Sequence, residues 1–200
     1  MSKNSPVSRL RHELDQAITY GTKKAATQVA RFALAQAKKR KQSGEIEYFQ
    51  GQLDILKGNF VSAIEHFDAA IKYNPRDGAA YNDRALSMVE IGIIDDSFAY
   101  FDKGIAVEPD YATIYHNKGW LLNNIGRHTE AIKYFQIALE LEPDRAVTYD
   151  NLADARLNLG DSRGALEAYR KVLALLKPKS CPGIRKEIKK QIRILEKKAE

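Results

Sequence analysis

Apolar residues recur every three or four positions along most of the chain, a spacing that predicts amphipathic helices rather than strands. The pattern itself repeats every 34 residues, so that like residues fall into columns. Within each copy a glycine separates two apolar stretches, and a proline closes the copy. The pattern therefore predicts an all-α chain built from repeated pairs of helices.

Five columns define the repeat: two of small residues, one of glycine, one of aromatic residues and one of proline. The members are Gly51, Ala85, Gly119 and Ala153; Gly58, Gly92, Gly126 and Gly160; Ala63, Ser97, Ala131 and Ala165; Phe67, Phe101, Phe135 and Tyr169; and Pro75, Pro109 and Pro143, with Pro178 shifted by one. The glycines predict left-handed turns between the helices. The small residues predict close helix crossings, filled by the aromatic side chain of the neighbouring helix.

Polar residues beside the glycines and prolines are candidates for capping the next helix. They are Asn59, Asp161, Asp77, Asp110 and Asp144. One helix pair cannot bury both of its apolar faces, so the pairs are expected to stack on one another.

The period, with its order of small, glycine, small, aromatic and proline residues, resembles the tetratricopeptide repeat (TPR) family. The resemblance implies a right-handed α-solenoid of stacked helix-turn-helix repeats with helical caps. It covers residues 44–178 as four copies, at 44–77, 78–111, 112–145 and 146–178.

The sequence also predicts helices on both sides of the repeats. Residues 1–43 predict a basic helical pair, which a degenerate repeat would also explain, although only Ala17 fits its columns. Residues 179–200 predict a basic C-terminal helix with one apolar stripe of Ile184, Ile188, Ile192 and Leu195. Such a helix suits the exposed end of a repeat array, which needs a polar cap.

Charge divides the chain in the same way. The net charge of +6 combines +8 in residues 1–43, −9 in residues 44–170 and +7 in residues 171–200. The protein is therefore an acidic body with two basic ends, and not a uniformly basic chain.

In the TPR family the first helix of each pair lines an inner groove, so the resemblance indicates which residues face a partner. The partner-binding candidates are Tyr48, Gln52, Asn82, Asp83, Leu86, His116, Asn117, Trp120, Asn124, Asp150, Asn151 and Asp154. None is Lys or Arg, which argues against the chaperone C-terminal carboxylate that some relatives grip with cations. The expected ligand is a basic or neutral peptide or helix of another protein.

Within this set, Asn117 and Asn151 suit hydrogen bonding to a peptide backbone, because an amide both donates and accepts. Trp120, the single tryptophan, suits an interface anchor. The alternative for Trp120 is that it fills a gap between repeats. The predicted function is a non-enzymatic interaction scaffold or adaptor.

Other chemistry finds little support in the sequence. The four histidines have no ligand partners at metal-binding spacing, and no phosphate-binding glycine loop occurs. Cys181 lacks a nucleophile signature. We expect no catalytic residues, metal or cofactor. The sequence shows neither a transmembrane stretch nor a secretory signal, so a cytoplasmic location is expected.

The basic ends leave a second hypothesis open. The run Lys38, Lys39, Arg40 and Lys41 could bind an anionic membrane or nucleic acid, although it lacks the interleaved aromatic residues usual for single strands. Alternatively, these cations only stabilise a helix C-terminus. A basic end could also enter the acidic groove of a second copy and form a homo-oligomer.

Overall fold

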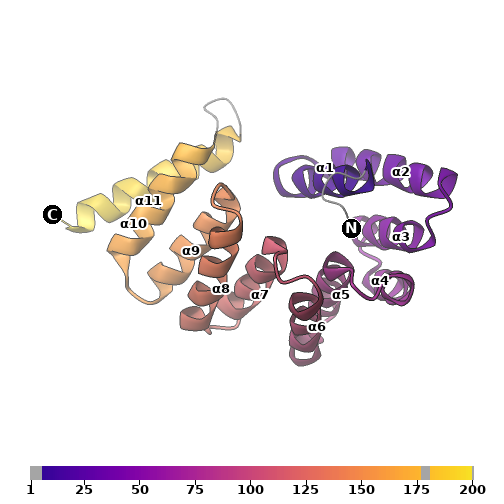
Figure 1. Cartoon of the computed structure of the whole chain (residues 1–200). Coiled ribbons are helices and arrows are strands. Elements are labelled where there is room, and N and C mark those ends of the chain that lie inside the picture. The colour runs from indigo at the N-terminus through magenta and orange to yellow at the C-terminus, as the bar shows by residue number, and fades with distance from the viewer. Residues whose placement is uncertain (1–5, 177–180, 200) are drawn as a thin grey trace. The chain divides into compact units, whose positions relative to one another are not determined.

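The computed structural model describes residues 6–176 and 181–199, and this part of the chain is helical with no strand. It forms two compact units, residues 1–109 and residues 110–200. Pro178 and the predicted boundary at 178/179 lie outside the described residues. Figure 1 shows the helices as successive antiparallel hairpins.

The described residues of unit 1 form six helices, and each packs on the next. They are α1 (Pro6–Tyr20), α2 (Lys23–Lys39), α3 (Ser43–Lys57), α4 (Phe60–Tyr73), α5 (Gly78–Glu90) and α6 (Ile94–Val107). Because α2 packs on α3, the N-terminal pair extends the stack of helices in this unit.

In unit 2, residues 110–176 and 181–199 form five helices, again packed in chain order. They are α7 (Ala112–Asn124), α8 (His128–Leu141), α9 (Ala146–Asn158), α10 (Ser162–Leu175) and α11 (Pro182–Ala199). The first helices of the two repeats, α7 and α9, also touch each other.

The small and aromatic columns meet at the helix crossings. A Cβ placed on Gly51 would lie 2.7 Å from the Phe67 ring, and one on Gly119 would lie 2.8 Å from the Phe135 ring. Both phenylalanines are fully buried. The glycine is therefore required by the aromatic ring that occupies the space of its missing side chain.

The turns between paired helices follow the predicted geometry. The four recurring glycines have φ between 78° and 87°, a region that other residues rarely adopt. Asp77 and Asp161 cap α5 and α10 by accepting hydrogen bonds from the backbone of Ala80 and Gly164. The other capping predictions differ from the structure: Asn59 makes no side-chain cap bond, and Asp110 and Asp144 each precede the capping position by one residue.

The C-terminal helix α11 covers the end of unit 2. Ile188 and Leu195 are buried against α10, Ile192 is partly buried, and Ile184 stays 42% exposed. Arg185 donates from Nη1 to the carbonyls of Leu173 and Leu176, which end α10 without helical partners. Apolar packing and this cation together attach the basic helix to the repeat before it.

Candidate functional site

The twelve candidate residues lie on the first helices of the repeats but are not equally accessible. Five belong to unit 1 and seven to unit 2, and the two sets are described separately below. Tyr48, Gln52, Asn82, Asp83 and His116 are buried; Leu86, Asn117, Trp120, Asp150 and Asn151 are half-buried; Asn124 and Asp154 are exposed. The buried five differ from the expected open lining, because they bond to neighbouring residues instead of facing solvent.

In unit 1, Arg11 of α1 crosses to two later helices. Its Nη2 lies 3.0 Å from Glu45 Oε1 and 2.7 Å from Asp77 Oδ2, and its Nε and Nη1 bond the same two carboxylates. The guanidinium also lies 3.7 Å from the centre of the Tyr48 ring. Although burial lowers the pKa of Arg11, the charge and hydrogen bonds of Asp77 raise it well above its usual value.

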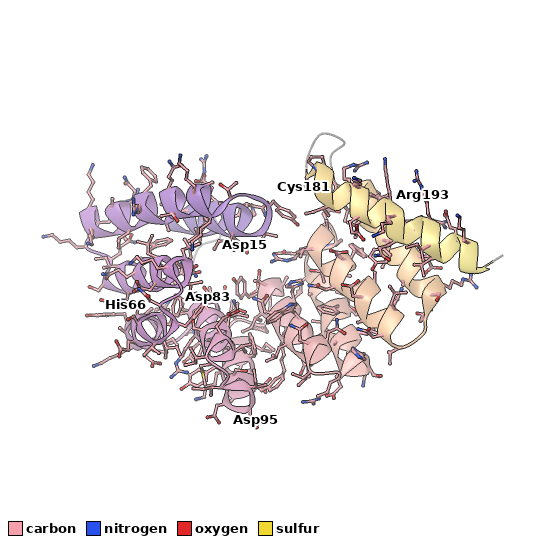
Figure 2. All side chains as sticks on the ribbon, turned by 180° about the vertical axis from the view of Figure 1, so that it is seen from behind. Asp15, His66, Asp83, Asp95, Cys181 and Arg193 are labelled. Atoms are coloured by element: carbon pink, nitrogen blue, oxygen red, sulfur yellow. The ribbon has the colours of Figure 1, made fainter. Side chains whose placement is uncertain are left out.

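A second buried group surrounds Asp83, which Figure 2 labels on α5. Tyr48 Oη donates to Asp83 Oδ2 at 2.8 Å, and Asn82 Nδ2 donates to Oδ1 at 2.8 Å. Gln52 Nε2 donates to Asp83 and, at 3.2 Å, to Tyr48. Burial raises the pKa of Asp83 to about 7, although the bonds from Tyr48 and Asn82 lower it.

The inner positions of unit 1 are therefore satisfied from within the chain. Asp83, one of the acidic candidates for contacting a partner, is buried and bonded, and so is Glu45 on α3. Arg11 was not among the predicted residues, and Asp77 was predicted only as a helix cap. Arg11 lies one 34-residue period before Glu45, so extending the repeat columns into the N-terminal helix would have placed the two side by side.

In unit 2, a buried histidine orients one of the candidate amides. His116 Nδ1 lies 3.0 Å from Thr148 Oγ1, and Asn151 Nδ2 lies 3.4 Å from His116 Nε2. Burial and the nearby charge of Arg145 lower the pKa of His116 to about 3. The ring is therefore neutral, and a proton on Nδ1 lets it donate to Thr148 while Nε2 accepts from Asn151.

Two carboxylates of α9 lie close to the Asn151 amide in the sequence: Asp150 precedes it directly, and Asp154 follows three residues later. Burial and the charge of Asp154 raise the pKa of Asp150 to about 6. Asp154 is exposed and accepts a 2.6 Å hydrogen bond from Tyr169 Oη of α10. Burial, this hydrogen bond and the charges of the two carboxylates raise the pKa of Tyr169. Unlike Glu45 and Asp77 of unit 1, Asp150 and Asp154 make no ion pair within the described part of the chain.

The face of unit 2 can therefore supply three kinds of contact. Asp150 and Asp154 offer negative charge, Asn117 and Asn151 offer amides, and Trp120 offers a half-buried indole on α7. All lie on two adjacent first helices.

The basic run predicted as an alternative site is on the surface. Lys38 and Lys39 lie in the last turn of α2, Arg40 caps that helix, and Lys41 follows with φ of 54°. All four side chains are exposed. This position fits both the electrostatic role at the helix end and an anion-binding surface.

The described residues contain no group of three or more His, Cys, Asp or Glu side chains placed to hold a metal ion. Within the same part of the chain, every helix is too short or too polar to cross a lipid bilayer.

Comparison with known proteins places the fold in a family. Two models described as tetratricopeptide repeat match residues 50–106 and 110–177, which together exceed half of the chain. No curated protein sequence matches the chain significantly.

Solved structures agree with this match at low sequence identity. A thermophilic TPR protein of Thermus thermophilus has a TM-score of 0.74 and 21% identity over 92% of this chain and 97% of its own. YrrB, a TPR protein with an unusual peptide-binding site, has a TM-score of 0.59 and 17% identity over 92% of this chain and 88% of its own. The first TPR of Spaghetti, bound to an HSP90 peptide, has a TM-score of 0.56 and 18% identity over 60% of this chain and 94% of its own. With its 34-residue period and stacked helical hairpins, the chain belongs to the tetratricopeptide repeat family.

Proposed function

We propose that this protein is a non-enzymatic scaffold that binds a basic or neutral segment of a partner protein on the face of α7 and α9. The TPR fold supports a role in protein–protein interaction. The observation that carries the finer proposal is the pair Asp150 and Asp154, which lack an ion-pair partner among the described residues.

The neighbouring side chains support the same ligand. Asn151 is held by neutral His116, so its amide is ordered before a partner arrives, which lowers the entropy lost on binding. Trp120 adds an aromatic surface of the kind that often dominates interface energies. A chaperone peptide such as the one bound to Spaghetti does not suit this chain, because the twelve candidates include no cation and Arg11 is already bonded to two carboxylates.

The single tryptophan makes the proposal directly testable. A synthetic dodecapeptide of glycine and serine with three lysines should change the Trp120 fluorescence, and the same peptide with three glutamates should not. Replacing Asp150 and Asp154 together by Asn should weaken binding about tenfold. Glu140→Gln, an exposed carboxylate on α8, is the matched control and should leave binding unchanged.

A larger change of the Trp120 fluorescence with the glutamate peptide than with the lysine peptide would overturn the proposal. A complementary test captures partners from the native host with wild-type protein and with the double variant Asn117→Ala and Trp120→Ala. Equal recovery of the same partners by both would also contradict it.

A second candidate function rests on α11. Lys186, Lys190 and Arg193 recur at helical spacing on the side of α11 away from α10, where Figure 2 labels Arg193. Glu187 and Glu196 lie to either side and bond Lys190 and Arg170. This cationic stripe suits an anionic lipid surface, at about 1 kcal/mol for each cation.

The test of the second candidate is sedimentation with vesicles containing phosphatidylserine, compared with neutral vesicles. Changing Lys186, Lys190 and Arg193 to Glu should abolish sedimentation. The same reversal at Lys72, Lys133 and Lys171, which are exposed on other helices, should only reduce it. Retention on duplex DNA without vesicle binding would contradict this candidate and indicate a nucleic-acid surface instead.

A further inference from the structure

Unit 1 contains an apolar pocket that none of the contacts described above uses. It has a volume of about 280 Å³ and is formed by α1, α2 and α3. Its lining residues are Ala17, Ile18, Lys23, Ala26, Ile55 and Leu56. Five of the six are aliphatic, so the pocket leaves apolar surface open to solvent. In contrast, Gln52, which precedes Ile55 and Leu56 on α3, is buried and hydrogen-bonded.

The exposure of Ile18 shows that the described residues do not fill this pocket. Ile18 is 49% exposed, although its helical spacing from Leu10 and Leu14 puts the three apolar residues on one face of α1. Leu10 and Leu14 are buried, so α1 is anchored by its earlier turns and presents Ile18 at the pocket. Covering such a side chain with apolar atoms is favourable.

The charge at the pocket is positive. Lys23 contributes to the lining and makes no ion pair with any residue that the structure describes. Lys24 beside it is also exposed. The nearest acidic residue in the sequence to Ile55 and Leu56, Asp54, bonds Lys57 at 2.8 Å and lies 3.5 Å from His66. The lining itself therefore combines an apolar floor with one positive charge, the reverse of the acidic face in unit 2, while Asp15 of α1 lies two residues before Ala17 in the sequence.

The volume decides what kind of ligand fits. Small-molecule sites usually occupy about 300–1,000 Å³, so this pocket lies just below their range. One or two apolar side chains of a peptide would fill it, with the rest of the peptide outside and close to the lysines. Charge complementarity with Lys23 and Lys24 then favours an acidic peptide.

We propose that this pocket binds an apolar side chain of an acidic segment of a partner protein, with Lys23 contacting the carboxylates that flank it. The inference rests on the proposed function and extends it, because it gives unit 1 a ligand of opposite charge to the ligand of unit 2. One chain could then hold two different partner segments, which is the property of an adaptor.

The probe is a synthetic dodecapeptide of glutamate, serine and glycine with one central leucine, titrated into the full-length protein. Methyl NMR of isoleucine and leucine residues should show shifts at Ile18, Ile55 and Leu56. A peptide with serine in place of the leucine should bind at least tenfold more weakly, as expected when one apolar anchor is lost.

Matched variants separate the pocket from general effects of charge. Ile18→Glu should weaken binding about tenfold, whereas Val61→Glu, which places the same side chain at a 62% exposed position of α4, should change it less than twofold. Lys23→Glu should weaken binding about fivefold, and Lys72→Glu on α4 less than twofold. Because Ile18 is already half exposed, Ile18→Glu should keep the helical circular dichroism of the wild type.

Three results would overturn the inference: equal loss in Ile18→Glu and Val61→Glu, shifts confined to residues outside the pocket, or equal binding of the serine peptide. The lysine peptide that tests the face of unit 2 provides the reference. If that peptide binds and the acidic peptide does not, the pocket proposal fails and the proposed function stands; if neither binds, both fail.

Discussion

Arg11 is the residue on which the inner face of unit 1 depends most directly. It joins α1 to Glu45 on α3 and to Asp77, the capping residue of α5, while its guanidinium stacks on Tyr48. Burial raises the pKa of Glu45 even though Arg11 lowers it, so the carboxylate depends on the cation to remain charged. One side chain therefore connects three first helices.

We expect Arg11→Met to lower the free energy of unfolding by about 3 kcal/mol, because it leaves two buried carboxylates without their cation. The measurement is urea denaturation followed by circular dichroism. The control is Arg9→Met, which removes an ion pair to Glu13 with side chains 82% and 44% exposed. That change should cost less than about 0.5 kcal/mol. Equal losses in the two variants would show that the Arg11 clamp contributes no more than a surface pair.

Asp83 should make stability depend on pH. Its pKa in the folded protein is about 7, above the ordinary 3.8, so between these values the folded protein keeps a proton that the unfolded chain releases. The stabilisation is complete below about pH 4 and is lost as the pH rises through 7, by up to about 4 kcal/mol. Asp150, with a pKa of about 6, contributes in the same direction.

Asp83→Asn should therefore flatten the fall in the free energy of unfolding between pH 4 and pH 7, measured by urea titrations at several pH values. The exposed Asp95→Asn, labelled in Figure 2 at the start of α6, serves as the control and should leave the slope as it is in the wild type. A wild-type stability that rises over this interval would contradict the prediction.

At the scale of helices, the residue types that recur in the repeat columns are those that the packing of each helix pair requires. Gly51 and Gly119 of the first helices face the rings of Phe67 and Phe135 on the second, and the four left-handed glycines reverse the chain between the paired helices. The elements could be predicted because these requirements recur every 34 residues. The predictions of Asp110 and Asp144 as caps were wrong because the capping position keeps the 34-residue period of Asp77, which places Tyr111 and Arg145 there instead.

We expect Gly119→Ala to destabilise the protein by about 1–3 kcal/mol, because the added Cβ would lie 2.8 Å from the Phe135 ring. In an unobstructed helix the same change would stabilise by up to about 1 kcal/mol. Gly183→Ala in α11, where a Cβ meets no atom within 4 Å, is the control and should cause no loss. Thermal unfolding measures both.

A second variant connects the loss to the ring itself. Adding Phe135→Leu to Gly119→Ala should cost less than the sum of the two single changes, because the smaller side chain makes room for the Cβ. Strict additivity would show that the glycine is needed for a different reason.

At the scale of the whole molecule, the chain combines two units with different inner faces. In unit 1 the acidic inner positions are bonded by Arg11 and by neighbouring amides, whereas unit 2 keeps Asp150 and Asp154 without a cation in the described residues. The C-terminal helix then covers α10 and closes the apolar surface at that end.

We expect residues 110–200 to fold when produced alone. The stability of a repeat array comes mainly from contacts within repeats and between neighbours, and this segment forms a compact unit with its own capping helix. Its circular dichroism should be helical, with a cooperative thermal transition. Removing residues 182–200 from the fragment should lower the transition temperature by exposing Val172 and Leu176. A fragment that stays unfolded would contradict the prediction.

By itself the sequence determined the helical pairs, their turns and the family, because helix periodicity and close crossings impose local, repeated constraints. It also indicated Asp150, Asn151 and Asp154, which remain accessible in the folded chain. Only the tertiary structure decided which inner residues are open. Burial and charge neutralisation depend on residues of other helices, and no single repeat contains that information. Arg11 of α1 neutralises Glu45 of α3, and Ile18 of α1 forms a pocket together with Leu56 of α3.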